Sequence, residues 1–246
     1  SFYYHTELPL PSDFKEAYPL SEKMKAAKCQ RDREISDIFT GKSHRFLVII
    51  GPCSADREDA VCEYVCRLAK ISEKPKTFAN YPSHLHQQAQ ATGIGYKGML
   101  HQPDPPPLSR PGQRTCGCAK APSACFYESG LSAADELLYP EIRSYLDDLL
   151  SYEAVGARSV ENQQHRLTAS GMDILLDENP TSGDLSVMFH AIYAAQQPQR
   201  FIFRGHEVTT DGNPLAHGIL RGGQTVMECL FPTTVFMTWN TAAENT

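Results

Sequence analysis

Residues 45–54 read Arg-Phe-Leu-Val-Ile-Ile-Gly-Pro-Cys-Ser, and this stretch decides the fold. Five apolar residues in a row, three of them β-branched, end at a Gly-Pro turn. A short run of this kind predicts a strand buried on both faces, as in a parallel sheet covered by helices. Residues 56–69 then place apolar side chains at helical spacing. The strand, the tight turn and the helix together predict an α/β fold.

Cys53 follows this strand at its carboxyl end, where the active-site residues of α/β folds are usually found. A cysteine there is either a small buried hydrophobe or a thiolate that binds a metal or acts as a nucleophile. The residues alone leave both interpretations open. A zinc-binding module built on Cys116, Cys118 and Cys125 is a further alternative, although their spacing matches no tetrahedral zinc pattern.

Length and composition narrow the class of protein. A chain of 246 residues suits a (β/α)8 barrel, which takes about 250 residues. The formal net charge of -6, without a long basic run, argues against nucleic acid as the main partner. No run approaches the roughly 18 apolar residues of a membrane span, and no secretory leader is visible. We therefore expect a cytoplasmic protein without membrane contact, whose eight cysteines are reduced thiols.

Three regions follow from the order of the patterns. Residues 1–44 form an N-terminal extension, with an extended arm followed by a helix over 21–39. Residues 45–223 alternate apolar strand runs with helical patterns, whereas residues 224–246 show no clear period. The strands are expected at 45–50, 131–138, 154–158 and 201–205, and the helices at 56–69, 141–151 and 185–195. About six βα units are recognisable where a closed barrel requires eight, so we expect an incomplete (β/α)8 TIM barrel.

Four short motifs give the sequence a family resemblance. They are Gly-Pro-Cys-Ser at 51–54, Gly-Tyr-Lys-Gly at 95–98, Gly-Ala-Arg at 156–158 and Leu-Arg-Gly at 220–222. In this order they resemble the class I 3-deoxy-7-phosphoheptulonate synthases. The resemblance covers roughly residues 5–74, 93–105 and 128–223. It implies a (β/α)8 barrel with an N-terminal extension that condenses phosphoenolpyruvate with erythrose 4-phosphate, the first step of the shikimate pathway.

The resemblance also implies cofactors, partners and site residues. In the family a divalent metal, manganese or similar, assists the reaction, an aromatic amino acid often inhibits it, and the enzyme is a homo-oligomer. Arginine suits phosphate recognition because its planar fork meets phosphate oxygens bidentately. We expect Arg158 and Arg221 to point into one pocket at the carboxyl ends of the strands. The implied residues are catalytic Glu136 and Arg158, substrate-binding Lys97, Ala157, Arg158 and Arg221, and the metal ligand Cys53.

Several segments interrupt the resemblance. Residues 83–90 stand where the family carries a basic second-strand motif, yet they contain no Arg or Lys. Suitable codons for these residues, read in a shifted frame, restore that motif, and single-base deletions explain residues 174–179 in the same way. Residues 106–126 are too rich in Pro and Gly for the helix expected there. We therefore interpret the chain as the product of a frame-damaged gene.

The interruptions lower the activity expected of the chain as written. The family's other metal ligands, a His, a Glu and an Asp on later strands, have no match in residues 224–246. One thiolate does not hold a divalent ion in a defined geometry. Two alternatives to an active synthase follow, an inactive remnant with weak phosphate binding and a phosphate-sugar binder on the same barrel.

Overall fold

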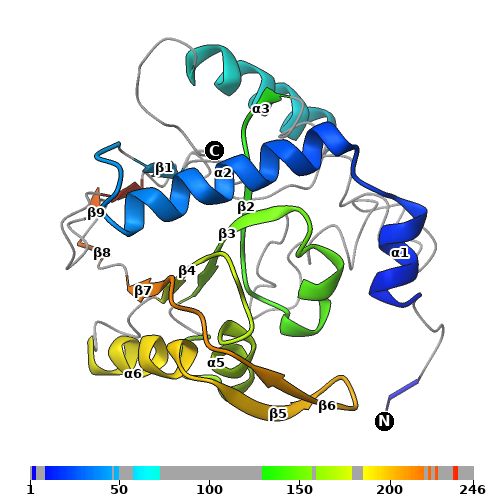
Figure 1. The fold of residues 1–246 in the computed structure, drawn as a ribbon, viewed down its shortest axis with the longest axis vertical. Coiled ribbons are helices and arrows are strands. Elements are labelled where there is room, and N and C mark those ends of the chain that lie inside the picture. Colours follow the sequence, from blue (N-terminus) through cyan, green and yellow to red (C-terminus); the bar gives the residue numbers. More distant parts are fainter. Residues whose placement is uncertain are drawn as a thin grey trace, which may run out of the picture.

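A four-stranded parallel sheet forms the centre of the protein (Figure 1). The computed structural model describes residues 2–3, 9–45, 47–49, 58–72, 129–156, 159–178, 185–218, 221–222, 225–226 and 235–237. The sheet order is β2-β3-β4-β7. These strands comprise Ala133–Glu136, Leu150–Val155, Leu175–Glu178 and Ala216–Gly218. Because parallel neighbours require crossover connections, the sheet and its helices make an α/β fold, as predicted.

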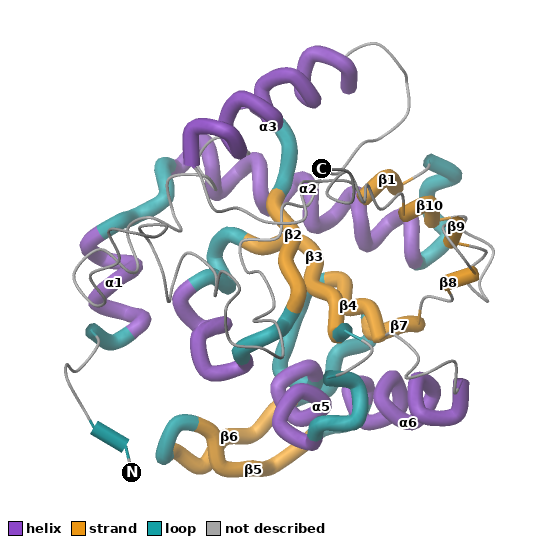
Figure 2. Tube along the Cα trace, turned by 180° about the vertical axis from the view of Figure 1, so that it is seen from behind, coloured by secondary structure: helices purple, strands orange, loops and turns teal. Residues whose placement is uncertain are grey.

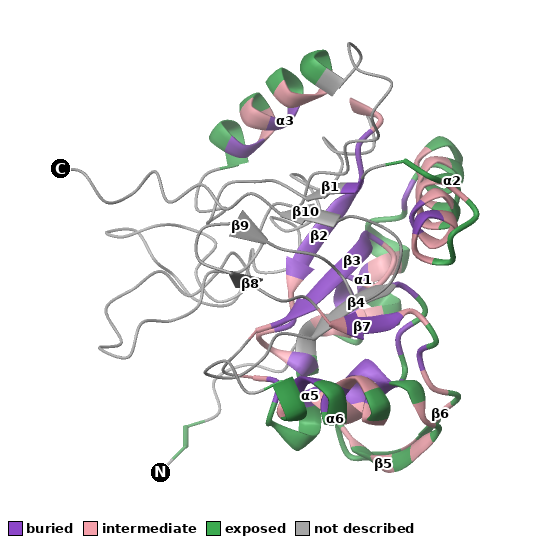
Figure 3. Ribbon diagram, turned by 90° about the vertical axis from the view of Figure 1, so that its left-hand side faces the viewer, coloured by how far each residue is buried: buried purple, intermediate pink, exposed green. Residues whose placement is uncertain are grey.

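Helix α2 (Glu22–Phe39) packs against one side of this sheet, in contact with β3 and β4. The Ser21 side chain caps it by accepting a hydrogen bond of 3.2 Å from the Met24 amide. Ile35 and Ile38 on its inner face are buried. They share one apolar cluster with Leu47, Ala134, Tyr152 and Ala154, residues of strands β1, β2 and β3. Figure 3 shows α2 at one side of the sheet, with buried residues along β2, β3 and β7.

A second apolar cluster covers the outer surface of the sheet. It includes residues of α5 (Gln163–Ala169) and α6 (Leu185–Gln196), which pack against each other and lie together beside β7 (Figure 2). The short helix η1 (Pro140–Tyr145) joins β2 to β3. Helix α1 (Pro11–Ala17) packs on η1 through an edge-to-face contact of the Phe14 and Tyr145 rings, 5.9 Å between centroids.

The remaining elements form pairs outside the central sheet. Strand β1 (Leu47–Ile49) runs parallel to β10 (Val235–Met237). Strands β5 (Gln199–Phe203) and β6 (His206–Thr210) form an antiparallel hairpin, as do β8 (Arg221–Gly222) and β9 (Thr225–Val226). Helix α3 (Glu58–Ser72) follows β1 along the chain. Within the described part of the chain, no helix is long and apolar enough to span a membrane.

Most expected elements are confirmed, including the helices at 21–39, 56–69 and 185–195. The helix expected at 141–151 is wrong. That region holds η1, a turn and the start of β3, because residues from Leu150 through Val155 are all buried and form a strand between β2 and β4. The expected strand at 154–158 accordingly begins earlier, at Leu150.

Three further expectations need correction. The arm contains helix α1, which begins with Pro11, a residue whose missing N–H costs nothing in a first turn. The expected strand at 201–205 belongs to a hairpin, since Arg204 and Gly205 both have positive φ, 51° and 76°, and form a two-residue turn. Finally, Cys62 on α3 is disulfide-bonded rather than reduced.

Candidate active site at the carboxyl ends of β2 and β3

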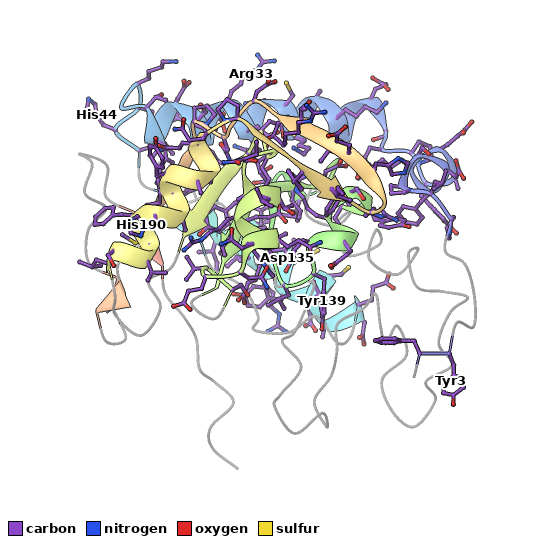
Figure 4. All side chains as sticks on the ribbon, turned by 90° about the horizontal axis from the view of Figure 1, so that it is seen from below. Tyr3, Arg33, His44, Asp135, Tyr139 and His190 are labelled. Carbon is purple, nitrogen blue, oxygen red and sulfur yellow. The ribbon has the colours of Figure 1, made fainter. Side chains whose placement is uncertain are left out.

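Glu136 is the last residue of β2 and lies at the carboxyl edge of the sheet. It is paired with Ala154 of the parallel strand β3. The Leu137 amide donates to the Ala154 carbonyl at 2.8 Å, and the Asp135 carboxylate accepts from the Glu136 amide at 2.8 Å. The backbone that carries the Glu136 carboxylate is therefore fixed on both sides. Asp135 and Tyr139 mark this end of β2 and the connection that follows it in Figure 4.

The Glu136 carboxylate lies against Gly156, the residue that follows β3. A Cβ atom added to Gly156 would be 2.0 Å from Glu136 Oε1 and 3.2 Å from Glu136 Cδ. The shorter distance is far inside van der Waals contact, so any residue larger than glycine would force this carboxylate to move. Gly156 directly precedes Ala157 and Arg158 in the sequence. The carboxylate of Glu136 therefore lies beside the point where the Gly-Ala-Arg segment leaves the sheet.

Hydrogen bonds hold the described backbone on either side of residues 157–158. The Gly156 carbonyl accepts hydrogen bonds from the amides of Ser159 at 2.8 Å and Val160 at 3.0 Å. Asn162 then caps helix α5, and its Oδ1 accepts from the Gln164 amide at 2.9 Å. Both flanks of residues 157–158 are thus fixed by hydrogen bonds, which is the usual requirement for a binding segment mounted on a rigid scaffold.

A buried ion pair links η1 to β3 near this end of the sheet. Arg143 of η1 donates from Nε to Oε2 of Glu153 on β3 at 2.9 Å. The two side chains are 12% and 3% exposed, so the pair is almost dry. Glu153 alternates with Ala154, which shares the α2-facing cluster, so Arg143 and Glu153 lie on the opposite face of β3. The pair joins η1 to β3, the strand that Gly156 follows.

The structure places some of the expected site residues and leaves others untested. Glu136 is the last residue of β2, and its catalytic role stays a prediction. The backbone of Arg221 belongs to β8. Cys53, Lys97, Ala157 and Arg158 lie outside the described residues, as do residues 83–90 and 106–126. The shared pocket of Arg158 and Arg221 therefore stays a prediction.

The described ranges contain no set of ligands for the divalent metal that the family resemblance implies. There, no group of three or more His, Cys, Asp or Glu side chains could hold a metal ion. We accordingly derive no chemical step through a metal.

Two residues of this region were not predicted from the sequence to belong to the site. Gly156 was named only as part of the Gly-Ala-Arg motif. A single sequence does not show which side chain lies where a Cβ atom of residue 156 would be. His165 on α5 is 8% exposed and lies near the connection that follows Glu136. Burial lowers the pKa of His165, against smaller opposing effects of the Leu138 and Leu137 backbone and of Glu141. In the sequence, His165 is a single histidine in a segment with a helical pattern, which does not indicate a site.

Comparisons with known proteins point to one family. The model of the DAHP synthetase I family matches residues 18–230. The Tyr-sensitive phospho-2-dehydro-3-deoxyheptonate aldolase of Escherichia coli (strain K12) is 33% identical over 225 residues, which cover 88% of this chain and 62% of that protein. The Phe-sensitive protein of the same strain is 34% identical over 226 residues, 89% of this chain and 64% of that protein.

A solved structure gives the same answer for the fold. Phospho-2-dehydro-3-deoxyheptonate aldolase from Francisella tularensis SCHU S4 superimposes with a TM-score of 0.82 at 26% identity, over 91% of this chain and 67% of that one. The chain spans about 62% of the length of the curated Escherichia coli relative that it matches. With the family model covering residues 18–230, the chain belongs to the DAHP synthetase I family.

Proposed function

We propose that this site serves the reaction of a 3-deoxy-7-phosphoheptulonate synthase, the condensation of phosphoenolpyruvate with erythrose 4-phosphate and release of phosphate. One observation carries the proposal: the Glu136 carboxylate is held against Gly156, where the Gly-Ala-Arg segment of a family member leaves the sheet. A solved family structure supports a further proposal, that the complete protein closes the parallel strands into a (β/α)8 barrel.

Each site residue has a proposed role in that reaction. Arg158 and Arg221 bind the phosphate of phosphoenolpyruvate, because guanidinium groups match phosphate oxygens bidentately. The Ala157 backbone and Lys97 complete the substrate contacts. The Glu136 carboxylate exchanges a proton with the reacting substrate, a task for which its fixed backbone is suited. Cys53 remains a proposed ligand of the family's divalent metal.

The alternative is an inactive remnant that retains weak phosphate binding. Residues 83–90 favour it, because they stand in the place of the basic motif and carry no Arg or Lys. Losing one charge-assisted contact to a transition state can cost on the order of a hundredfold in rate. Several such losses together would leave binding without useful turnover.

Phosphate release with both substrates and added manganese separates the two proposals. The chain is compared with its Arg158→Met variant and with a version in which the reading frame of residues 83–90 is restored. Phosphate release above that of Arg158→Met supports the synthase. Binding of phosphoenolpyruvate without phosphate release, together with release by the restored version, supports the remnant. Equal rates in all three proteins would contradict both.

Regulation and assembly are further proposals. Relatives of this chain are named Tyr-sensitive and Phe-sensitive, so we propose that an aromatic amino acid inhibits the complete protein. We also propose a homo-oligomer. Thermal shifts measured with tyrosine and phenylalanine, and light scattering of the purified protein, test the two proposals separately.

A further inference from the structure

His165 is a buried histidine whose ring is close to the Leu137 and Leu138 backbone without making a hydrogen bond of ordinary geometry. It is the third residue of α5 and is 8% exposed. Among the described residues, neither Nδ1 nor Nε2 of this ring has a hydrogen-bond partner. A buried polar group without partners destabilises a fold, whereas an apolar side chain of similar size would fill the space without that penalty. The proposed function, as derived above, does not use this ring.

Some groups around His165 favour the protonated ring, whereas burial favours the neutral ring. Helix α5 packs on η1, and the Leu137 and Leu138 backbone of the connection from β2 to η1 is close enough to act on the ring. The Leu137 and Leu138 backbone and the Glu141 carboxylate of η1 all favour the protonated ring, while burial favours the neutral ring. Within the described part of the chain, Glu141 is the charged group that acts on His165 from a packed element; α6, which also packs on α5, supplies none.

The connection beside His165 is also the backbone that holds Glu136. The Leu137 amide donates to the Ala154 carbonyl, and the Leu138 amide donates to the Glu136 carbonyl, both at 2.8 Å. A shift of residues 137–138 toward the ring would therefore pull on Glu136 directly. On its other side, α5 begins only a few residues after the Gly-Ala-Arg segment. The ring is therefore close to the backbone that holds Glu136, and it belongs to the helix that follows the Gly-Ala-Arg segment in the sequence.

We propose that His165 is a positioning residue for Glu136: the neutral ring leaves residues 137–138 in place, and a proton taken up from solvent draws their carbonyls toward the ring and displaces the Glu136 carboxylate. This step moves one proton and changes no covalent bond of the chain. Its consequence for ligand binding rests on the proposed function, whereas the backbone movement does not.

The sign of the pH dependence follows from burial. Because the folded protein lowers the pKa of His165 from its ordinary value of 6.5, the unfolded chain takes up the proton first. Stability is therefore complete above that ordinary value and decreases as the pH falls through it toward the lowered value. Local displacement of residues 137–138 begins as the folded protein itself binds the proton, at the acidic end of this range.

The test follows the amide NMR signals of Glu136, Leu137 and Leu138 between about pH 7.5 and about pH 5, the range in which histidines titrate. We expect these signals to titrate together in the wild type and to lose this titration in His165→Gln. The control is His190→Gln, since His190 is an exposed histidine on α6 (Figure 4). Glu141→Gln should shift the midpoint to lower pH, because it removes a group that favours the protonated ring.

Binding of phosphoenolpyruvate, measured by calorimetry at the two ends of the range, gives the functional result. From the neutral to the acidic end, the affinity of the wild type for phosphoenolpyruvate should fall at least about fivefold more than the affinity of His165→Gln. His190→Gln should behave as the wild type. Amide signals that titrate equally in His165→Gln and in the wild type would overturn the inference. A purely structural role, which also overturns it, would give lower stability in His165→Gln with an unchanged pH dependence of binding. If the amides titrate as expected but no phosphoenolpyruvate binds at any pH, the positioning role stands and the proposed function fails.

Discussion

Replacing Gly156 with alanine is the sharpest perturbation of the candidate site. The new methyl group would be placed 2.0 Å from Glu136 Oε1, whereas ordinary contacts begin at 3.4 Å. The carboxylate must therefore move by more than one ångström. Gly156 has no positive φ, so the backbone itself accepts alanine without strain. The whole effect of the substitution falls on the position of Glu136.

The structure separates the expected cost in activity from that in stability. The atom in the way is the end of a flexible side chain, and overpacking that such an atom can relieve costs about 1 kcal/mol. The loss of chain entropy in unfolded alanine offsets about 0.4–1 kcal/mol of this, so the free energy of unfolding should hardly change. Misplacing a catalytic group by about 1 Å can cost about a hundredfold in rate. We expect a loss of that order in kcat/KM for phosphate release.

Two matched variants define the outcome. Gly171→Ala introduces a similar contact, 2.9 Å from Thr210 Cγ2, at a turn after α5, and should leave kcat/KM unchanged. Glu136→Ala removes the obstructed group, so adding Gly156→Ala to it should have no further effect. If Gly156→Ala lowers activity as much in that background as in the wild type, or if it has no effect at all, the assignment of Glu136 is wrong.

Two predictions concern stability and are measured by urea unfolding. Arg143→Met removes the guanidinium group that pairs with the buried Glu153 carboxylate and should cost about 3–5 kcal/mol, whereas Arg200→Met breaks an exposed pair and should cost about 1 kcal/mol or less. Equal costs for the two variants would contradict this argument. Ser21→Ala removes the cap of α2 and should cost about 1 kcal/mol, while Ser21→Asp, which keeps an acceptor for the Met24 amide, should retain most of the stability.

The sequence predicted the parts of the fold in which local pattern and tertiary environment agree. Helix α2 was predictable because its apolar spacing, its Ser21 cap and its terminal Gly41 all indicate the same boundaries. The region 141–151 was not, because its leucines fit a helix as well as a turn followed by a strand. Only pairing of β3 with β2 and β4 on both sides decides for the strand.

The candidate site was predictable to a similar, limited extent. Glu136 was expected within a strand at 131–138, and it is the last residue of β2, whereas its catalytic role stays a prediction. The contact between Glu136 and Gly156 joins residues of two strands, and the burial of His165 depends on the packing of α5 on η1. Neither relation leaves a periodic signal in one sequence, so both required the structure.

The central claim is that the segment beside Glu136 binds the phosphate of phosphoenolpyruvate through Arg158. Calorimetric titration of phosphoenolpyruvate into the wild type, Arg158→Met and the exposed control Arg200→Met tests it most directly. A hydrogen bond to a charged group contributes about 1.5–3 kcal/mol, so Arg158→Met should weaken binding by more than about tenfold. The control should bind as the wild type does. Equal affinities of the wild type and Arg158→Met would contradict the claim.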